Sequence, residues 1–412
     1  MSHRAPILSL YAANAISRVG DVLMLLALPW FVLQTTGSVG LTGLVAAVEA
    51  AGVAVTGISG ALLVDRLGAK WSSVLSDAAS GVIVLAVPAL YELHRLPFPL
   101  LLGLVFLAGA CATPGSIARQ ALVPGLAERA RANLDRVNTV IDGVSRVGTL
   151  VGAPLAGLLI VLIGTTNLFT LDGISFLASA VMIGVFVNGM QRPDPEASTL
   201  RESLAHLREG LAFIRREPLI RSLMLVIMTT NLLDGGLYAV LAPAYIRATY
   251  HSAILFGELS GALGLGAVVG TILYGLWGYR LPRRATFAAG YIAAGAPRFW
   301  AIVFLPFPPL MLLATALVST GIGPVNPALH TTLYQVVEPR LQPRVFGALT
   351  TGVTIGTPIG ALLAGALATV WSPWGAIVIF SGLYLAATAS LVVNPALRSM
   401  ARVDERSALG VS

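Results

Sequence analysis

Three polar side chains near the start of the chain, Asn14, Arg18 and Asp21, stand at i, i+4 and i+7 within a long apolar stretch. This spacing places them on one face of a helix. An ionised side chain in apolar surroundings is costly, so each such residue is a candidate for function. The carboxylate can bind a proton or contact a cation, while Arg18, one turn away, favours the charged form.

A second set lies about half a chain further on. Asn231, Asp234 and Tyr238 stand at i, i+3 and i+7 and again share one helical face. Asp21 lies eight residues before Pro29, and Asp234 lies nine residues before Pro243. The two carboxylates are therefore expected at nearly equivalent depth in the membrane.

Further charges fall inside apolar stretches. Asp142 and Arg146 stand at i, i+4 and can pair, whereas Glu49 has no partner in the sequence. For the pairs Arg18–Asp21 and Asp142–Arg146, a purely structural ion pair is the alternative to a functional role. For Glu49 and Asp234, protonation or cation contact is favoured.

Other charges carry no assignment from the sequence. Asp77, Asp172 and Glu258 lie nearer the ends of apolar stretches, where snorkelling or capping explains them. Arg298 and His330 stand too isolated to interpret.

These residues belong to a chain that is 56% hydrophobic and only 11% charged, against about 25% in soluble domains. A window of about 19 residues finds twelve apolar stretches, without the alternation of strands. Their centres lie near Asp21, Gly52, Val82, Phe106, Val151, Ser179, Leu232, Gly266, Ala293, Ala316, Ile359 and Tyr384. The fold class predicted is an all-α polytopic membrane protein with twelve transmembrane helices.

The segment 136–159 repeats at 344–367, at an offset of 208 residues, with ten of 24 positions identical. Parallel halves of a transporter, related by an axis along the membrane normal, leave this signature. We therefore predict two pseudo-symmetric six-helix bundles, at residues 1–190 and 218–396. A cytoplasmic linker at 191–217 and a tail at 397–412 complete the division.

The linker is the one long polar segment. A capping-box pattern, Thr199-x-x-Glu202, precedes leucines at helical spacing, which predicts an amphipathic helix on the inner membrane surface. A solvated connector is the alternative.

Charge placement sets the expected orientation. Most of the 26 Lys and Arg residues, including the clusters at 119–136 and 192–221, fall on one side of the predicted spans, and only Arg95 and Arg247 fall in loops on the other. The positive-inside rule then puts both termini in the cytoplasm. The net charge of +7 is better explained by an anionic inner leaflet than by nucleic acid, for which we expect no binding.

The segment that joins the second and third spans holds Gly60, then Asp65-Arg66, then Gly68 and Lys70. This pattern resembles the cytoplasmic loop signature of the major facilitator superfamily. Its glycines allow close helix approach and a tight turn, and its acidic residue can latch the inner side shut. We expect a cytoplasmic gate formed by Gly60, Asp65, Arg66, Gly68 and Lys70.

Five further segments carry a narrower resemblance: Val19-Gly20-Asp21, Ala27-Leu28-Pro29-Trp30, Leu134-Asp135-Arg136, Leu171-Asp172 to Phe176, and Glu209-Gly210 to Phe213. Through them the chain is similar to the drug:proton antiporter branch of that superfamily, which holds macrolide and tetracycline/aminoglycoside efflux pumps, and most of all to actinobacterial resistance exporters. The antiporter signature of the fifth span is only partly kept. The fourth span holds no arginine by this division, where many proton antiporters carry one.

The expected packing motif of the fifth and eleventh spans comprises Gly148, Gly152, Pro154, Gly157, Gly356 and Gly360. The resemblance implies export of amphipathic drug-like molecules from a bacterial plasma (inner) membrane by proton antiport with alternating access. Proton-coupling residues are then Asp21, Glu49, Asp142 and Asp234, with Arg18 and Arg146. The substrate cavity is expected to include Asn14, Trp30, Asn231 and Tyr238.

A lipid or lysolipid flippase of the same fold is the alternative, because it too needs an apolar cavity with a few charges. An enzyme is not expected, since the five histidines are scattered and no catalytic motif appears. A lone cysteine, Cys111, excludes an internal disulfide and a cysteine metal cluster. The expected partners are a small molecule, protons and membrane lipids, with no cofactor or metal, and the expected state is a monomer.

Overall fold

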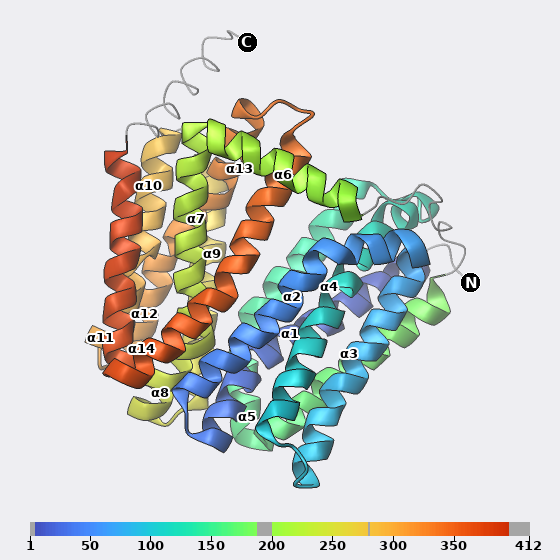
Figure 1. Cartoon of the computed structure of the whole chain (residues 1–412), viewed down its shortest axis with the longest axis horizontal. Coiled ribbons are helices and arrows are strands. Elements are labelled where there is room, and N and C mark those ends of the chain that lie inside the picture. Colours follow the sequence, from blue (N-terminus) through green and yellow to red (C-terminus); the bar gives the residue numbers. More distant parts are fainter. Residues whose placement is uncertain (1–4, 188–199, 279–280, 395–412) are drawn as a thin grey trace.

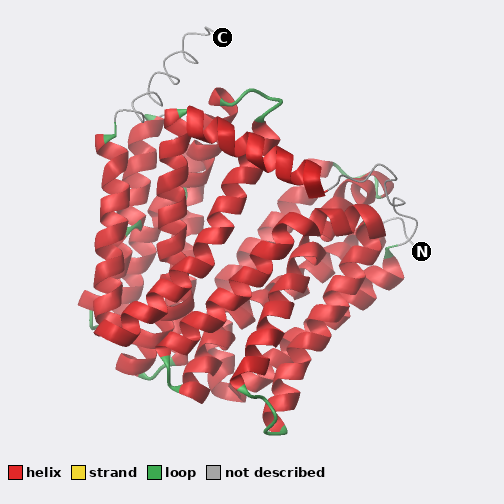
Figure 2. Ribbon diagram, viewed as in Figure 1, coloured by secondary structure: helices red, strands yellow, loops and turns green. Residues whose placement is uncertain are grey.

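The computed structural model describes residues 5–187, 200–278 and 281–394, and the regular structure of these residues is helical throughout (Figures 1 and 2). The first half comprises α1 (Ala5–Thr36), α2 (Val39–Leu67), α3 (Ala69–Glu92), α4 (Phe98–Arg129) and α5 (Leu134–Phe186). The connecting helix is α6 (Leu200–Arg216). The second half comprises α7 (Pro218–Gly236), η1 (Leu237–Leu241), α8 (Ala242–Tyr250), α9 (Ala253–Trp277), α10 (Arg283–Ala294), α11 (Ala296–Phe304), α12 (Pro308–Ser319), η3 (Thr320–Ile322), α13 (Val325–Val336) and α14 (Gln342–Val393).

Ten helical runs of the described residues are long and apolar enough to cross a membrane. Two of them, α5 and α14, are each broken by a residue with positive φ, Gly164 at 83° and Ser372 at 76°. Each break divides a run of more than 50 residues, which is about twice what one bilayer crossing needs. Twelve crossings result, and the predicted fold class is confirmed.

The two breaks lie 208 residues apart, the offset of the sequence repeat. The repeated segments also pack in the same way. The first part of α5 packs on α1 of its own half and on α9 of the other, and that of α14 packs on α7 and on α2. The repeat therefore marks the two helices that join the halves.

The halves meet where glycines face each other across the interface. Gly157 of α5 lies against Gly257 of α9, and Gly43 of α2 lies against Gly365 of α14. A Cβ at Gly157, Gly257 or Gly43 would overlap the opposing backbone, and one at Gly365 would make a tight contact with it. At the same end the Arg247 guanidinium donates to the carbonyl oxygen of Leu33. From this closed end the bundles diverge toward the end crossed by α6 (Figure 1).

The other predicted packing positions behave differently from one another. Gly152 lies against Val22 of α1, and Gly360 lies against the backbone of Leu232 in α7. The Pro154 ring packs against Gly261 of α9, where a Cβ would overlap it, and Gly356 packs more loosely against Met228 of α7. Gly148, by contrast, has no described neighbour within 4 Å of where its Cβ would stand, so the close approach expected there is absent in this conformation.

Helix α6 directs its apolar face toward the second half. Leu207, Leu211 and Ile214 pack into a core with α7 and α14, and Gly210 lies on the backbone of Arg344. Arg344 also forms an ion pair with Glu209. The protein itself thus covers part of the face expected to rest on lipid. Thr199 and the start of the linker lie outside the described residues, and the division at 190 and 218 stays a prediction.

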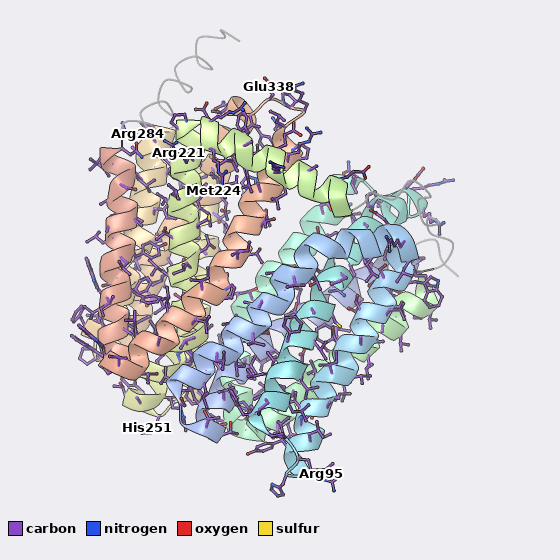
Figure 3. All side chains as sticks on the ribbon, viewed as in Figure 1. Arg95, Arg221, Met224, His251, Arg284 and Glu338 are labelled. Atoms are coloured by element: carbon purple, nitrogen blue, oxygen red, sulfur yellow. The ribbon has the colours of Figure 1, made fainter. Side chains whose placement is uncertain are left out.

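The turn between α2 and α3 has the form that its glycines suggest. Gly68 takes φ 78° and caps α2, while Gly60 packs on Pro114 and Ile117 of α4. Lys70 lies 5.5 Å from the centre of the Trp71 ring. Figure 3 shows Arg221, Arg284 and Glu338 at the end crossed by α6, and Arg95 and His251 at the opposite end.

Prediction one concerns the glycine contact between the halves. Gly157→Val should lower the thermal unfolding midpoint in detergent, because the added isopropyl group must displace the α9 backbone, at a cost of about 1–3 kcal/mol. Gly148→Val is the matched control in the same helix and should change the midpoint little, since its Cβ points into open space. Equal effects of the two substitutions would contradict the interface described.

Candidate functional site

A cavity of about 300 Å³ lies inside the first half, enclosed by α1, α2, α3, α4 and the part of α5 beyond Gly164. Its apolar lining includes Met24, Val53, Val84 and Phe176. Its charged lining comprises Arg18, Asp21, Glu49, Arg119 and Asp172. Three carboxylates and two guanidinium groups therefore share one small space.

Arg18 and Asp21 form the loosest ion pair of this space. Arg18 Nη1 lies 3.7 Å from Asp21 Oδ2, and the side chains are 50% and 38% exposed. The geometry fits the predicted i, i+3 pairing, yet neither group is committed to a short hydrogen bond. Asp21 is free to respond to whatever else enters the cavity.

Glu49 lies where α2 and α4 come closest. Gly52 faces the backbone of Phe106 and Ala110, and Gly109 faces the carbonyl oxygen of Glu49 itself. These glycines bring the two helices together and hold the Glu49 side chain at the cavity wall. No hydrogen bond or ion pair to Glu49 is present among the described residues.

Arg119 corrects two expectations at once. It lies within α4, not in a cytoplasmic cluster, so the fourth span does hold an arginine. Its Nη1 donates to Asp77 Oδ1 at 2.5 Å, and both side chains are nearly fully buried. The apolar window centred on Phe106 ended too early, because α4 continues past Pro114 to Arg129.

Asp77 is likewise not a snorkelling residue at a span end. Besides Arg119 it accepts a hydrogen bond from Ser179 Oγ at 2.7 Å, while Arg119 Nη2 reaches Ser17 Oγ at 3.4 Å. The pair thus joins α3 and α4 to α1 and α5. A signal for it was present in the sequence, since α3 carries a polar buried face of Ser72, Ser73, Ser76, Asp77 and Ser80 at helical spacing.

Asp172 was assigned to capping or snorkelling, and the structure contradicts this as well. It is 1% exposed and lines the cavity. A Cβ at Gly20 would overlap Asp172 Oδ1, so the carboxylate lies directly against the backbone of α1. Sequence reasoning missed it because it comes only eight residues after the break at Gly164.

The second half holds a different arrangement around Asp234. Arg298 of α11 forms an ion pair with Asp234, and its side chain is only 3% exposed. The guanidinium carbon lies 5.3 Å from the Tyr238 ring centre and 5.7 Å from that of Phe299. Arg298, which the sequence left uninterpreted, is therefore the partner of Asp234.

The remaining predicted residues do not gather at the cavity. Trp30 is buried between the halves, stacked on Phe256 with ring centres 6.4 Å apart. Asn231 Nδ2 donates to the Ile227 carbonyl oxygen at 2.9 Å, and Asn14 is half-buried in α1 outside the cavity lining. The side chains of Asp142 and Arg146 lie outside what the structure describes.

Two further hollows lie at the end of the bundles crossed by α6. One, of about 710 Å³, is lined by α2, α3 and α4 and includes Gly60, Arg66 and Cys111. The other, of about 630 Å³, is lined by α9, α10 and η3. Neither brings titratable groups together. Among the described residues, no group of three or more His, Cys, Asp or Glu side chains is placed to hold a metal ion.

Twelve apolar crossings in two related halves, with ionised groups enclosed between helices, define a multi-pass membrane protein of the kind that moves solutes. The model of the Major Facilitator Superfamily matches residues 10–233 and 224–407. The multidrug efflux pump Tap of Mycolicibacterium fortuitum is 31% identical over 370 residues, 89% of this chain and 90% of that protein. The chain belongs to the major facilitator superfamily, and its resemblance to actinobacterial drug exporters is confirmed.

Two other comparisons agree with this family. The putative bacilysin exporter BacE of Bacillus subtilis is 28% identical over 220 residues, 53% of each chain. A mutant of the nucleoside transporter NupG superposes with a TM-score of 0.79 over 94% of this chain and 99% of that one. At 10% identity this last likeness shows the fold alone.

Prediction two concerns the buried pair. Arg119→Ala should destabilise the protein by about 3–5 kcal/mol, because Asp77 would remain buried without its counter-charge. The matched control is Arg340→Ala, which breaks the exposed pair with Glu338 and should cost about 0–1 kcal/mol. Thermal unfolding in detergent measures both. A shift no larger for Arg119→Ala than for Arg340→Ala would mean that the pair does not hold the first half together.

Proposed function

We propose that this protein is a secondary active exporter that moves amphipathic, cationic drug-like molecules out of the bacterial cytoplasm in exchange for protons. Its relatives support the direction and the class of substrate, since one is named a multidrug efflux pump and another a putative exporter. Export from the plasma (inner) membrane, with both termini cytoplasmic, is part of the same proposal.

The observation that carries the proposal is the charge content of the cavity in the first half. Asp21, Glu49 and Asp172 face two guanidinium groups, and Arg119 is already paired with Asp77. The cavity therefore has more carboxylates than counter-charges, and protons or a cationic substrate complete the balance. A site that either can neutralise is what exchange of the two requires.

Asp21 is the group best placed to bind the proton and the cationic substrate in turn. When it is ionised, it attracts a cationic substrate and Arg18; when protonated, it releases both. The cavity is small for a whole drug-like molecule, so we propose that it receives the charged end of the substrate while the apolar part lies between the halves.

Transport further requires that the site open to each side in turn. The glycine contacts between α5 and α9 and between α2 and α14 close one end. Rocking of the halves about the first parts of α5 and α14 would close the other, where Gly60 to Lys70 form the proposed gate. Such rigid-body rocking is general for transporters with internal repeats.

The orientation has its own test, which is prediction three. In a Cys111→Ala background, single cysteines at Thr36 and Ser372 should react with an impermeant maleimide added to whole cells. A cysteine at Glu338 should react only after the cells are opened, because it lies at the end proposed to face the cytoplasm. Reaction of the Glu338 position in intact cells would reverse the proposed topology.

Prediction four tests the function itself. Expression in a host lacking its own pumps should raise resistance to some cationic amphipathic drugs. Inverted vesicles should take up the same drugs when a proton gradient is applied. Asp21→Asn should abolish proton-driven uptake and weaken drug binding, because the amide, like the protonated acid, neither exchanges a proton nor attracts the cation.

The control variant is Glu338→Gln, which removes an exposed carboxylate far from the cavity and should leave uptake unchanged. Full proton-driven uptake by both Asp21→Asn and Glu49→Gln would end the assignment of these residues. A resistance panel without any response, together with lysolipid translocation in vesicles, would favour a flippase instead.

A further inference from the structure

We propose that Asp172 is a further proton-binding residue of the first half, and that its proton is needed for α1 to pack as it does in this conformation. The proposal deepens the proton antiport proposed above and rests on it for its role in transport. It assigns to the sixth span a group that no part of the sequence reasoning placed in the coupling machinery.

The first reason is how few donors the carboxylate has. The Ser175 hydroxyl is its sole hydrogen-bond donor among the described residues, at 3.5 Å from Oδ1. The same hydroxyl lies closer, 2.8 Å, to the backbone carbonyl oxygen of Asp172, which takes its one proton. A carboxylate that is 1% exposed and lacks a real donor is stable as the neutral acid.

The second reason is the set of charges around it. Every helix packed around the cavity presents charged groups there or just behind its wall. These are Arg18 and Asp21 from α1, Glu49 from α2, Asp77 from α3 and Arg119 from α4. Arg119 is committed to Asp77, and Arg18 lies beside Asp21. An ionised Asp172 would therefore add a negative charge to a group that already has an excess.

The third reason comes from the internal symmetry. The offset of 208 residues, which relates both the repeat and the two helix breaks, takes Asp172 to Phe380. Phe380 is 1% exposed and packs on Gly236 at the end of α7, as Asp172 packs on Gly20 of α1. Because an apolar ring serves this packing in the second half, packing alone does not require a carboxylate at 172.

Gly20 links this acid to the proposed exchange. It precedes Asp21, so the α1 backbone that covers Asp172 also carries the exposed carboxylate of the cavity. Loss of the Asp172 proton would leave a charge trapped against α1, which movement of α1 could relieve by admitting water or a cation. Protonation thus favours this conformation, and its population should fall as the pH rises.

The test measures the distance between the halves, without substrate or gradient. Spin labels at Glu128→Cys and Arg340→Cys in a Cys111→Ala background report on the last turn of α4 in the first half and on the segment between α13 and α14 in the second. An Asp21→Asn, Glu49→Gln background removes the other two acids that line the cavity. In it, the ratio of the two conformations should still change by up to about tenfold per pH unit, as one proton allows.

Adding Asp172→Asn to that background should abolish this pH dependence and hold the protein in the present conformation, because the amide mimics the neutral acid. Ser175→Ala is the matched control and should leave the dependence in place. Infrared spectra at neutral pH should show a carboxylic acid band that Asp172→Asn removes. Thermal unfolding of the variant should match that of its background, which separates coupling from misfolding.

Unchanged pH dependence after Asp172→Asn, or an infrared spectrum that the substitution leaves unaltered, would overturn the inference. These readouts involve no transport, so the two proposals fail separately. A pH-dependent distance that needs Asp172 in a protein that exports nothing would overturn only the proposed function.

Discussion

An ionised group inside an apolar bundle is stable only when another charge, a set of donors or a bound proton compensates it. At mid-bilayer each uncompensated charge costs about 2.5–3.5 kcal/mol on insertion scales. The two halves of this protein meet that requirement differently. In the second half Asp234 is held by Arg298, whose guanidinium also lies over aromatic rings. In the first half Asp77 and Arg119 are paired, but Asp21, Glu49 and Asp172 remain with one loosely placed arginine.

This difference bears on which half responds to protons. A paired carboxylate gains little from a proton, because protonation breaks its ion pair. Protonation of a buried carboxylate without an ion-pair partner is far more favourable, because it removes an uncompensated charge. In the proposed antiport, the excess of acids in the first half would concentrate proton exchange there, while the charge of the second half is already balanced. Coupling would then depend on contacts between the halves, which are made by glycine and alanine positions of α2, α5, α9 and α14.

The sequence predicted the fold well because span length, apolar content and the repeat are properties of whole segments. The tight turn at Gly68 was also predictable, because it depends only on the residues next to it in the chain. The sequence singled out Asp21 and Glu49 as proton-binding candidates because both stand near the middle of a span, and both line the cavity. It misplaced Arg119, Asp77 and Asp172, since a hydropathy window blurs the ends of spans and α4 extends well beyond its apolar centre. Partners such as Arg298 and Asp234 lie 64 residues apart, and nothing in the sequence indicates that the fold brings these two side chains together.

The repeat itself explains why the chemistry differs between halves that share a fold. The identical positions between 136–159 and 344–367 are mainly glycine, alanine and leucine, the residues that set how closely helices approach. Of the charged positions only Arg136 and Arg344 coincide. Close packing constrains both halves equally, because the same small residues bring the helices of the two halves together. Charge is constrained only where a proton or substrate is handled, so a carboxylate at 172 and a phenyl ring at 380 can occupy related places without disturbing the fold.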